Sequence, residues 1–147
     1  MKSATQYCTF LVDGLYFGID VLRVQEVIRT LPLTRVPLAA PAVKGLINLR
    51  GQLVTAIDLR TTLHLTPRDE SQEPMNVVVR TDDGAISLLV DDIGDVIVPD
   101  EATFENPPET IPAEARAFIK GVYKLPGSLL LVLDTVGAFG NGAATGT

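Results

Sequence analysis

Short runs of apolar and β-branched residues, separated by turn residues, follow one another along the whole chain. Runs of four to eight such residues between Gly, Pro, Asn or Asp predict strands. The first two runs flank Asp13-Gly14, a dipeptide typical of a hairpin turn. The pattern predicts ten strands in two groups of five, over residues 7–12, 16–20, 24–28, 46–49, 53–58, 77–80, 85–90, 93–98, 118–125 and 129–133.

Helices are expected to be few and short. A helical turn is predicted at about residues 20–23, and a short helix over residues 59–65 with Asp58 as its N-cap. Three prolines interrupt residues 30–42, which we expect to be mostly irregular. Residues 66–74 are polar throughout and read as a linker.

The two halves of the chain resemble each other at a nearly constant spacing. The matched features are Lys44-Gly45 with Lys120-Gly121, Gly51 with Gly127, and Asp58 with Asp134. Self-similarity of this kind indicates a duplicated module. The sequence therefore predicts an all-β fold of two five-stranded barrels, over 7–65 and 76–139, within a single domain spanning 1–147. Asp134 is expected to cap a second short helix over residues 135–139.

The net charge and the composition of the chain limit which kinds of partner it can bind. The chain has 147 residues, a length typical of one domain, and a net charge of −6 from 12 Lys+Arg and 18 Asp+Glu. This charge disfavours nucleic acid and anionic lipid as partners. No apolar stretch is long enough to insert into a membrane. Cys8 is the single cysteine, so no internal disulfide can form, and we expect a cytoplasmic location.

Signatures of catalysis are absent from the sequence. His64 is the single histidine and reads as an exposed helix residue, so neither a Cys/His dyad nor a zinc cluster has obvious ligands. Asp82-Asp83 and Asp91-Asp92 read as solvated turn and strand-end residues, because neighbours on a strand point to opposite faces. We find no phosphate-binding glycine loop. These observations favour a protein without catalytic activity, metal or cofactor.

Arg50-Gly51 and Pro126-Gly127 are expected to occupy the same turn in the two repeats, with Arg50 standing where the other repeat has proline. Gly supplies a positive φ in such turns, and Pro is common at the preceding position. Arginine is not required by the turn itself. Arg50 is therefore either a solvated turn charge or a side chain with a task beyond folding.

Several segments together resemble the CheW family of chemotaxis coupling proteins. These are residues 17–21 and 24–28, the Thr34-Arg35-Val36-Pro37 segment, Val43-Lys44-Gly45-Leu46-Ile47-Asn48-Leu49-Arg50-Gly51, Ile57-Asp58-Leu59-Arg60, residues 89–96 and Phe118-Ile119-Lys120-Gly121. The resemblance covers residues 6 to 139. One departure is Thr55, where family members commonly carry proline, and we expect it to alter strand detail only.

The resemblance implies a non-catalytic adaptor made of two five-stranded SH3-like barrels. It implies two partners, the cytoplasmic tip of chemoreceptors and the regulatory domain of the histidine kinase CheA. Glu26 and Arg50 match a charged pair important for coupling, which we expect to be an ion pair. Val24, Gly45 and Val96 match surface positions implicated in receptor or kinase contact.

Two other function classes fit the sequence less well than the adaptor does. A barrel module that binds small molecules or sugars would need aromatic residues lining a cleft, yet aromatics make up 5% of the chain and Trp is absent. A hydrolase would need a catalytic role for Asp58 or Asp91. Within the adaptor class, the resemblance fits a flagellar, a pilus-based or another chemosensory system equally well.

Overall fold

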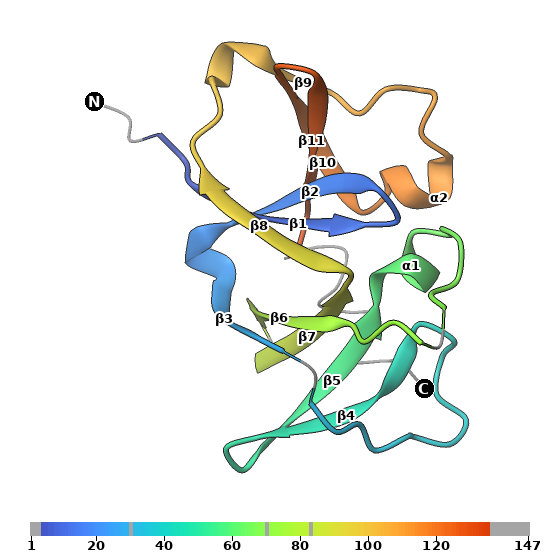
Figure 1. Cartoon of the computed structure of the whole chain (residues 1–147). Coiled ribbons are helices and arrows are strands. Elements are labelled where there is room, and N and C mark those ends of the chain that lie inside the picture. The colour runs from blue at the N-terminus through green and yellow to red at the C-terminus, as the bar shows by residue number, and fades with distance from the viewer. Residues whose placement is uncertain (1–3, 30, 70, 83, 136–147) are drawn as a thin grey trace.

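The computed structural model describes residues 4–135 except 30, 70 and 83. Its strands form two sheets, which lie one above the other in Figure 1. The strands are β1 (Tyr7–Val12), β2 (Leu15–Asp20), β3 (Val24–Ile28), β4 (Val43–Leu49), β5 (Gln52–Asp58), β6 (Met75–Thr81), β7 (Gly84–Val90), β8 (Asp92–Ile97), β9 (Phe104–Glu105), β10 (Ile119–Leu125) and β11 (Ser128–Leu133). The helices are η1 (Val21–Arg23), α1 (Leu59–Thr62), η2 (Glu101–Thr103) and α2 (Ala113–Arg116). The predicted all-β fold with short helices is confirmed.

The first sheet, here called sheet A, has the strand order β8-β1-β2-β11-β10-β9, and sheet B has the order β3-β6-β7-β5-β4. Sheet B is thus a continuous stretch of chain from β3 to β7. Sheet A combines the N-terminal hairpin β1–β2 with the later strands β8 to β11. The predicted barrel boundaries, 7–65 and 76–139, are therefore wrong, because each sheet takes strands from both ranges.

The sheets are related by an exchange of hairpins between the two repeats. In sheet B, Ile28 of β3 lies opposite Asn76 of β6 in an antiparallel pair. The equivalent antiparallel pair in sheet A is Ile97 of β8 opposite Tyr7 of β1. The parallel pairs are equivalent as well, with Thr55 opposite Ile86 and Leu131 opposite Phe17. Each repeat contributes its first hairpin to the sheet of the other repeat. The duplication predicted from the sequence is thus present, with crossed partners.

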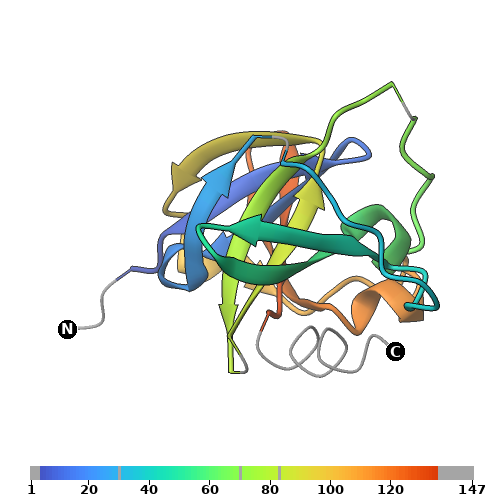
Figure 2. The same ribbon diagram turned by 90° about the horizontal axis from the view of Figure 1, so that it is seen from below.

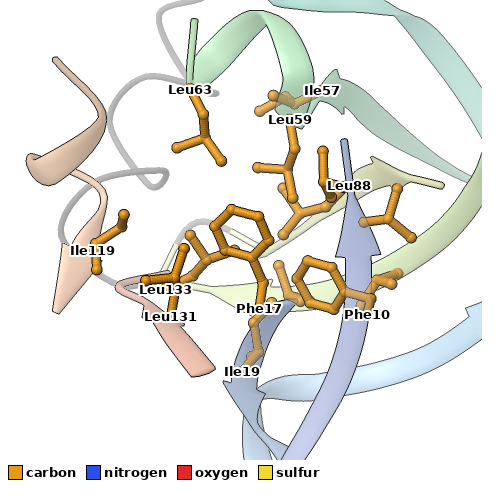
Figure 3. Packing of buried hydrophobic residues seen from close by; sticks show 14 of the residues in the cluster. Phe10, Phe17, Ile19, Ile57, Leu59, Leu63, Leu88, Ile119, Leu131 and Leu133 are labelled. Carbon is orange, nitrogen blue, oxygen red and sulfur yellow. The ribbon is translucent and has the colours of Figure 1, made fainter. Parts of the chain in front are cut away.

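One apolar core joins the sheets. Phe10, Phe17 and Ile19 of sheet A are at most 1% exposed and belong to the same buried cluster as Ile57 and Leu88 of sheet B (Figure 3). Two smaller clusters lie apart from it, one on strands of sheet B and one on strands of sheet A. Because burial of apolar surface is the main favourable term in folding, the shared cluster makes the two sheets one cooperative unit.

The polar stretch 66–74 does not connect the two sheets. It runs from α1 to β6, and β5 and β6 both belong to sheet B (Figure 1). The side chain of Arg68 is 9% exposed and makes ion pairs, so the stretch is anchored in the protein. We expected residues 66–74 to be a linker without packed side chains, and for Arg68 this expectation is wrong.

Candidate functional site

Glu26 and Arg50 form a two-pronged ion pair between the two outer strands of sheet B. The Arg50 Nη1 donates to Glu26 Oε2 at 2.6 Å, and Nη2 donates to Oε1 at 2.5 Å. Glu26 lies on β3, one end of the strand order, and Arg50 follows β4, the other end. The contact therefore brings the two edges of sheet B together, as expected of a barrel.

The ion pair sits at the surface. The Arg50 side chain is 71% exposed, and that of Glu26 is 20% exposed. The hydrogen bonds from Arg50 hold the pKa of the Glu26 carboxyl below its usual range, and the same bonds raise the pKa of Arg50. Both groups are therefore charged at neutral pH. The predicted pairing of Glu26 with Arg50 is confirmed.

The turn that carries Arg50 differs from the turn of the other repeat. Arg50 has a φ of +51° and Gly51 a φ of +88°, so both central residues are left-handed, as in a type I′ turn. Proline fixes φ near −65° and cannot adopt this conformation. Asn48 supports the turn, since its Oδ1 accepts from the Gly51 amide at 2.8 Å. The assumption that Arg50-Gly51 and Pro126-Gly127 share one backbone conformation was wrong.

Gly45 is buried at a bulge where β4 meets β5. An added Cβ would overlap the carbonyl of Thr34, whose residue pairs with Leu46 in an isolated bridge. Its φ of +155° also disfavours other residues. The structure therefore gives Gly45 a clear role in folding, because it lets the segment around Thr34 lie against β4.

The two valines of the predicted site lie on different sheets. Val24, on β3, is partly buried against the shared core, and Val96, on β8, is 54% exposed. Both strands are edge strands and lie on the same side of the molecule (Figures 1 and 2). Of the five predicted residues, the structure joins Glu26 and Arg50, keeps Val24 on the same strand, and separates Gly45 and Val96 from that pair.

Other exposed apolar side chains lie on or beside the same two edge strands. Leu22 of η1 is 80% exposed, Val27 of β3 is 40% exposed, and Val98, directly after β8, is 53% exposed. Apolar side chains exposed in this way are typical of a protein-contact surface when they gather together. Sequence reasoning missed these three, because strand propensity alone does not distinguish an edge strand from a buried one.

A partly buried charge network lies where the chain passes from β7 to β8. The Asp91 carboxylate accepts from Arg60 Nη2 at 2.6 Å, from Arg68 Nη2 at 3.0 Å and from the Asp13 amide at 2.7 Å. Arg68 also pairs with Asp58 at 3.2 Å. These contacts join the β1–β2 turn, α1, the 66–74 stretch and the start of β8.

Burial would raise the pKa of Asp91, but the hydrogen bonds from Arg60, the Asp13 amide and Arg68 outweigh it and leave that pKa below its ordinary value. The bond to Asp91 in turn raises the pKa of Arg60. Asp91 is therefore ionised, paired with two arginines and only 20% exposed, so its interpretation as a solvated strand-end residue is wrong. The spacing of these residues along the chain gives no signal that they meet.

Asp58 and His64 lie close to where the sequence placed them. Asp58 is 4% exposed and caps α1, since its Oδ1 accepts from the Arg60 amide at 3.0 Å. The matching backbone bonds, from Asp58 to Ala42 and from Asp134 to Phe118, confirm that the two aspartates are structural twins. The helix predicted after Asp134, over 135–139, falls outside the described residues from 136 onward. His64 is exposed and follows α1.

Three further features of the described residues concern metal binding, membrane insertion and ligand binding. No group of three or more His, Cys, Asp or Glu side chains in the described part of the chain is arranged to hold a metal ion. Among the same residues, no helix is long and apolar enough to cross a membrane. An apolar cavity of about 460 Å³ lies between β2, β11, α1 and α2, and Phe17, Leu63 and Leu129 help to line it.

Comparison with known proteins matches almost the whole chain. The model of the CheW-like domain matches residues 6–141. The chain is 30% identical over 134 residues to the chemotaxis protein CheW of Bacillus subtilis (strain 168), covering 91% of this chain and 86% of that protein. It is 29% identical over 128 residues to the chemotaxis protein CheW of Thermotoga maritima, covering 86% of this chain and 82% of that protein.

A solved structure agrees with the sequence comparisons. The crystal structure of the scaffolding protein TtCheW from Thermoanaerobacter tengcongensis superimposes with a TM-score of 0.80 at 26% identity, covering 91% of this chain and 86% of that one. Fold, sequence and the two-sheet arrangement thus lead to one conclusion: the chain belongs to the family of CheW-like domains.

Proposed function

We propose that this protein is a non-catalytic chemosensory scaffold that couples chemoreceptors to the histidine kinase CheA. The observation that carries the proposal is the exposed Glu26–Arg50 pair on the edges of sheet B. Family resemblance supports a role of this pair in coupling, and the turn itself does not call for arginine at residue 50, since Arg50 occupies a backbone conformation that arginine disfavours. Cytoplasmic localisation follows from the proposed partners.

The exposed apolar residues on β3 and β8 support a role in protein contact. An amphipathic receptor helix buries its apolar face against such residues, and charged residues at the rim set orientation and specificity. Val96, Val27 and Leu22 supply apolar surface, while Glu26 and Arg50 supply the charges. The receptor's cytoplasmic tip is the partner proposed for this side of the molecule, and the regulatory domain of CheA is the second partner.

The test is reconstitution of receptor-controlled kinase activity. Receptor-containing membranes and CheA from the source organism are mixed with and without the purified chain, and CheA autophosphorylation is followed. The proposal expects activation only when all three components are present, and loss of that activation when attractant is added. CheA autophosphorylation that is the same with and without the chain would overturn the proposed function.

A small-ligand-binding module is the second candidate, favoured by the apolar cavity near Phe17. Cavities of this volume and apolar character are typical of small-molecule sites. The two candidates are separated by the same reconstitution, because a ligand module has no reason to activate the kinase.

A further inference from the structure

Within the described residues, the chain passes between the two sheets at two places. The first is η1, between β2 of sheet A and β3 of sheet B, and the second is Asp91, between β7 of sheet B and β8 of sheet A. The strands that follow these crossings are β3 and β8, the edge strands that carry Glu26 and Val96. The direction in which the chain leaves each crossing therefore sets how these two strands lie relative to each other (Figure 1).

The two crossings are built differently. At η1, the Asp20 carboxylate accepts from the Leu22 amide at 3.0 Å, and Arg80 Nη1 donates to the carbonyls of Leu22 and Val24. These contacts are exposed. At the second crossing, the Asp91 carboxylate pairs with Arg60 and Arg68, whose side chains are each 9% exposed, and the Asp91 side chain itself is 20% exposed. Mostly buried charged side chains thus hold the crossing into β8, whereas exposed contacts hold the crossing into β3.

The guanidinium groups at Asp91 are themselves fixed on both sides. Arg60 Nη1 donates to the carbonyl of Thr66 at 2.8 Å, and Arg68 Nη1 donates to Asp58 at 3.2 Å. The Asp91 amide donates to the carbonyl of Leu11 at 2.9 Å, which ties the crossing to β1 of sheet A. The network therefore links both sheets through one carboxylate.

The apolar core and the charge network contribute differently to the arrangement of the sheets. Apolar burial is non-directional, so the shared core holds the sheets together but tolerates small changes in their angle. Charge-assisted hydrogen bonds are directional, and those of arginine with a carboxylate are planar and two-pronged. Buried ion pairs are costly to desolvate, and their best-attested use is to fix one geometry.

We propose that Arg60, Arg68 and Asp91 are positioning residues, which hold β8 at a fixed angle to β3. Residues of two different sheets then form one protein-contact surface. This inference rests on the proposed function, because it assumes that a partner contacts both strands. The proposal predicts that a substitution at Arg60, Arg68 or Asp91 weakens partner binding, although none of the three residues belongs to the contact surface itself.

The first test measures the angle between the sheets without any partner. Spin labels are placed at Gln52 of sheet B and Ser128 of sheet A, both exposed, in a Cys8→Ser background, and the distribution of label distances is measured. Arg68→Gln should broaden or shift the distribution relative to the parent, and Arg68→Lys should stay nearer to the parent. Asp91→Asn keeps the shape of the side chain but removes the charge that Arg60 and Arg68 contact, so it should change the distribution in the same way as Arg68→Gln.

A matched control separates positioning from general loss of stability. Val54 is fully buried in the smaller cluster on strands of sheet B and does not belong to the core shared by the sheets. Val54→Ala destabilises the fold by opening a cavity, yet it leaves the crossing intact, so the label distances should stay as in the parent. A broadening as large as that of Arg68→Gln would overturn the proposal, as would an unchanged distribution in both network variants.

The second test measures binding to a purified receptor-tip fragment. We expect Arg68→Gln to weaken the affinity about tenfold, within the usual range of coupling between distant sites, and Val54→Ala to leave it unchanged. Equal affinities of Arg68→Gln and parent would contradict the positioning role. If the parent chain binds neither the receptor fragment nor CheA, the proposed function fails, while the label distances still decide whether the network fixes the sheets.

Discussion

At the scale of single residues, Arg50 combines an exposed charge with a backbone conformation that favours glycine. Its φ of +51° places the side chain in a region where Cβ is crowded by the following carbonyl. Comparison of the two turns drew attention to Arg50, but its premise is wrong, since proline cannot adopt the φ of Arg50. The contact with Glu26 could not be derived from residue spacing, because it depends on how sheet B closes.

The first prediction concerns Arg50→Gly and Arg50→Ala. Glycine relieves the positive φ, so Arg50→Gly should melt at the same temperature as the parent or a few degrees higher, while Arg50→Ala stays close to the parent. Both variants, and Glu26→Ala, should fail to support receptor-controlled kinase activity. Thermal melts followed by circular dichroism and the reconstituted kinase assay measure the two effects.

The control for this prediction comes from the other hairpin. Lys124 pairs with Glu105 at 2.5 Å at a comparably exposed site. Lys124→Ala removes an exposed ion pair as Arg50→Ala does, and it should retain coupling. The double exchange Glu26→Arg with Arg50→Glu should restore part of the activity if the mutual pairing matters. Unfolding of Arg50→Ala would show that Arg50 is a structural residue.

The second prediction concerns Gly45→Ala, which we expect to cost roughly 3 kcal/mol of unfolding free energy, since overlap with Thr34 adds to the strain of a positive φ. Gly127→Ala is the matched control, because Gly127 has a φ of +77° and open space around its Cα. It should cost only about 1 kcal/mol. Urea denaturation measures both. Equal costs would mean that the Thr34 segment moves aside freely.

At the scale of elements, the alternating apolar runs predicted where the strands are, but they did not predict which strands pair with each other. All ten predicted strands are present, because each combines β-branched residues with clear turn signals at its ends. The two-residue strand β9 was missed, since so short a segment has no periodicity. The exchange of β1–β2 and β6–β7 between repeats was also missed. Similar repeats offer similar edges, so a sequence pattern cannot tell which copy a hairpin pairs with.

The third prediction concerns the cap of α1. Asp58 both caps the helix and accepts from the buried Arg68, so Asp58→Ala should cost about 3–5 kcal/mol, the usual cost of breaking a buried ion pair. Asp100→Ala is the control, because Asp100 caps η2 at an exposed site and should cost only about 1 kcal/mol. The two costs are measured by urea denaturation. A cost for Asp58→Ala as small as that for Asp100→Ala would mean that the contact with Arg68 contributes nothing.

The fourth prediction concerns the stability of the charge network in acid. Since the hydrogen bonds to Asp91 outweigh burial and lower its pKa in the fold, its contribution is complete above the unfolded value of about 3.9 and is lost as pH falls through the folded pKa. Unfolding free energy should therefore drop below about pH 4. Asp91→Asn should be less stable at neutral pH and show a shallower drop, as measured by urea denaturation at several pH values. If the unfolding free energy of Asp91→Asn falls with pH as steeply as that of the parent, Asp91 does not cause the acid sensitivity.

At the scale of the whole molecule, duplication gives two related sheets with different surfaces. Sheet B carries the Glu26–Arg50 pair where its outer strands meet, whereas the equivalent turn of sheet A carries Pro126. The shared core and the Asp91 charge network together hold the sheets in one arrangement, so a partner bound across β3 and β8 leaves other faces of the molecule available. A scaffold that holds two different proteins at once needs this combination of rigid union and unlike faces.

The fifth prediction is that receptor fragment and CheA regulatory domain bind together, without competing for one site. Signalling contacts of modest area commonly have micromolar dissociation constants, about −8 kcal/mol, so each titration should be measurable by fluorescence with labelled chain. The dissociation constant for the kinase domain should be unchanged, or lower, at saturating receptor fragment. Arg50→Ala should weaken one partner and spare the other, because the Glu26–Arg50 pair occupies one place on sheet B. A receptor fragment that displaces the kinase domain in simple competition would mean that both partners use the same face, and the scaffold could then join them only by holding one at a time.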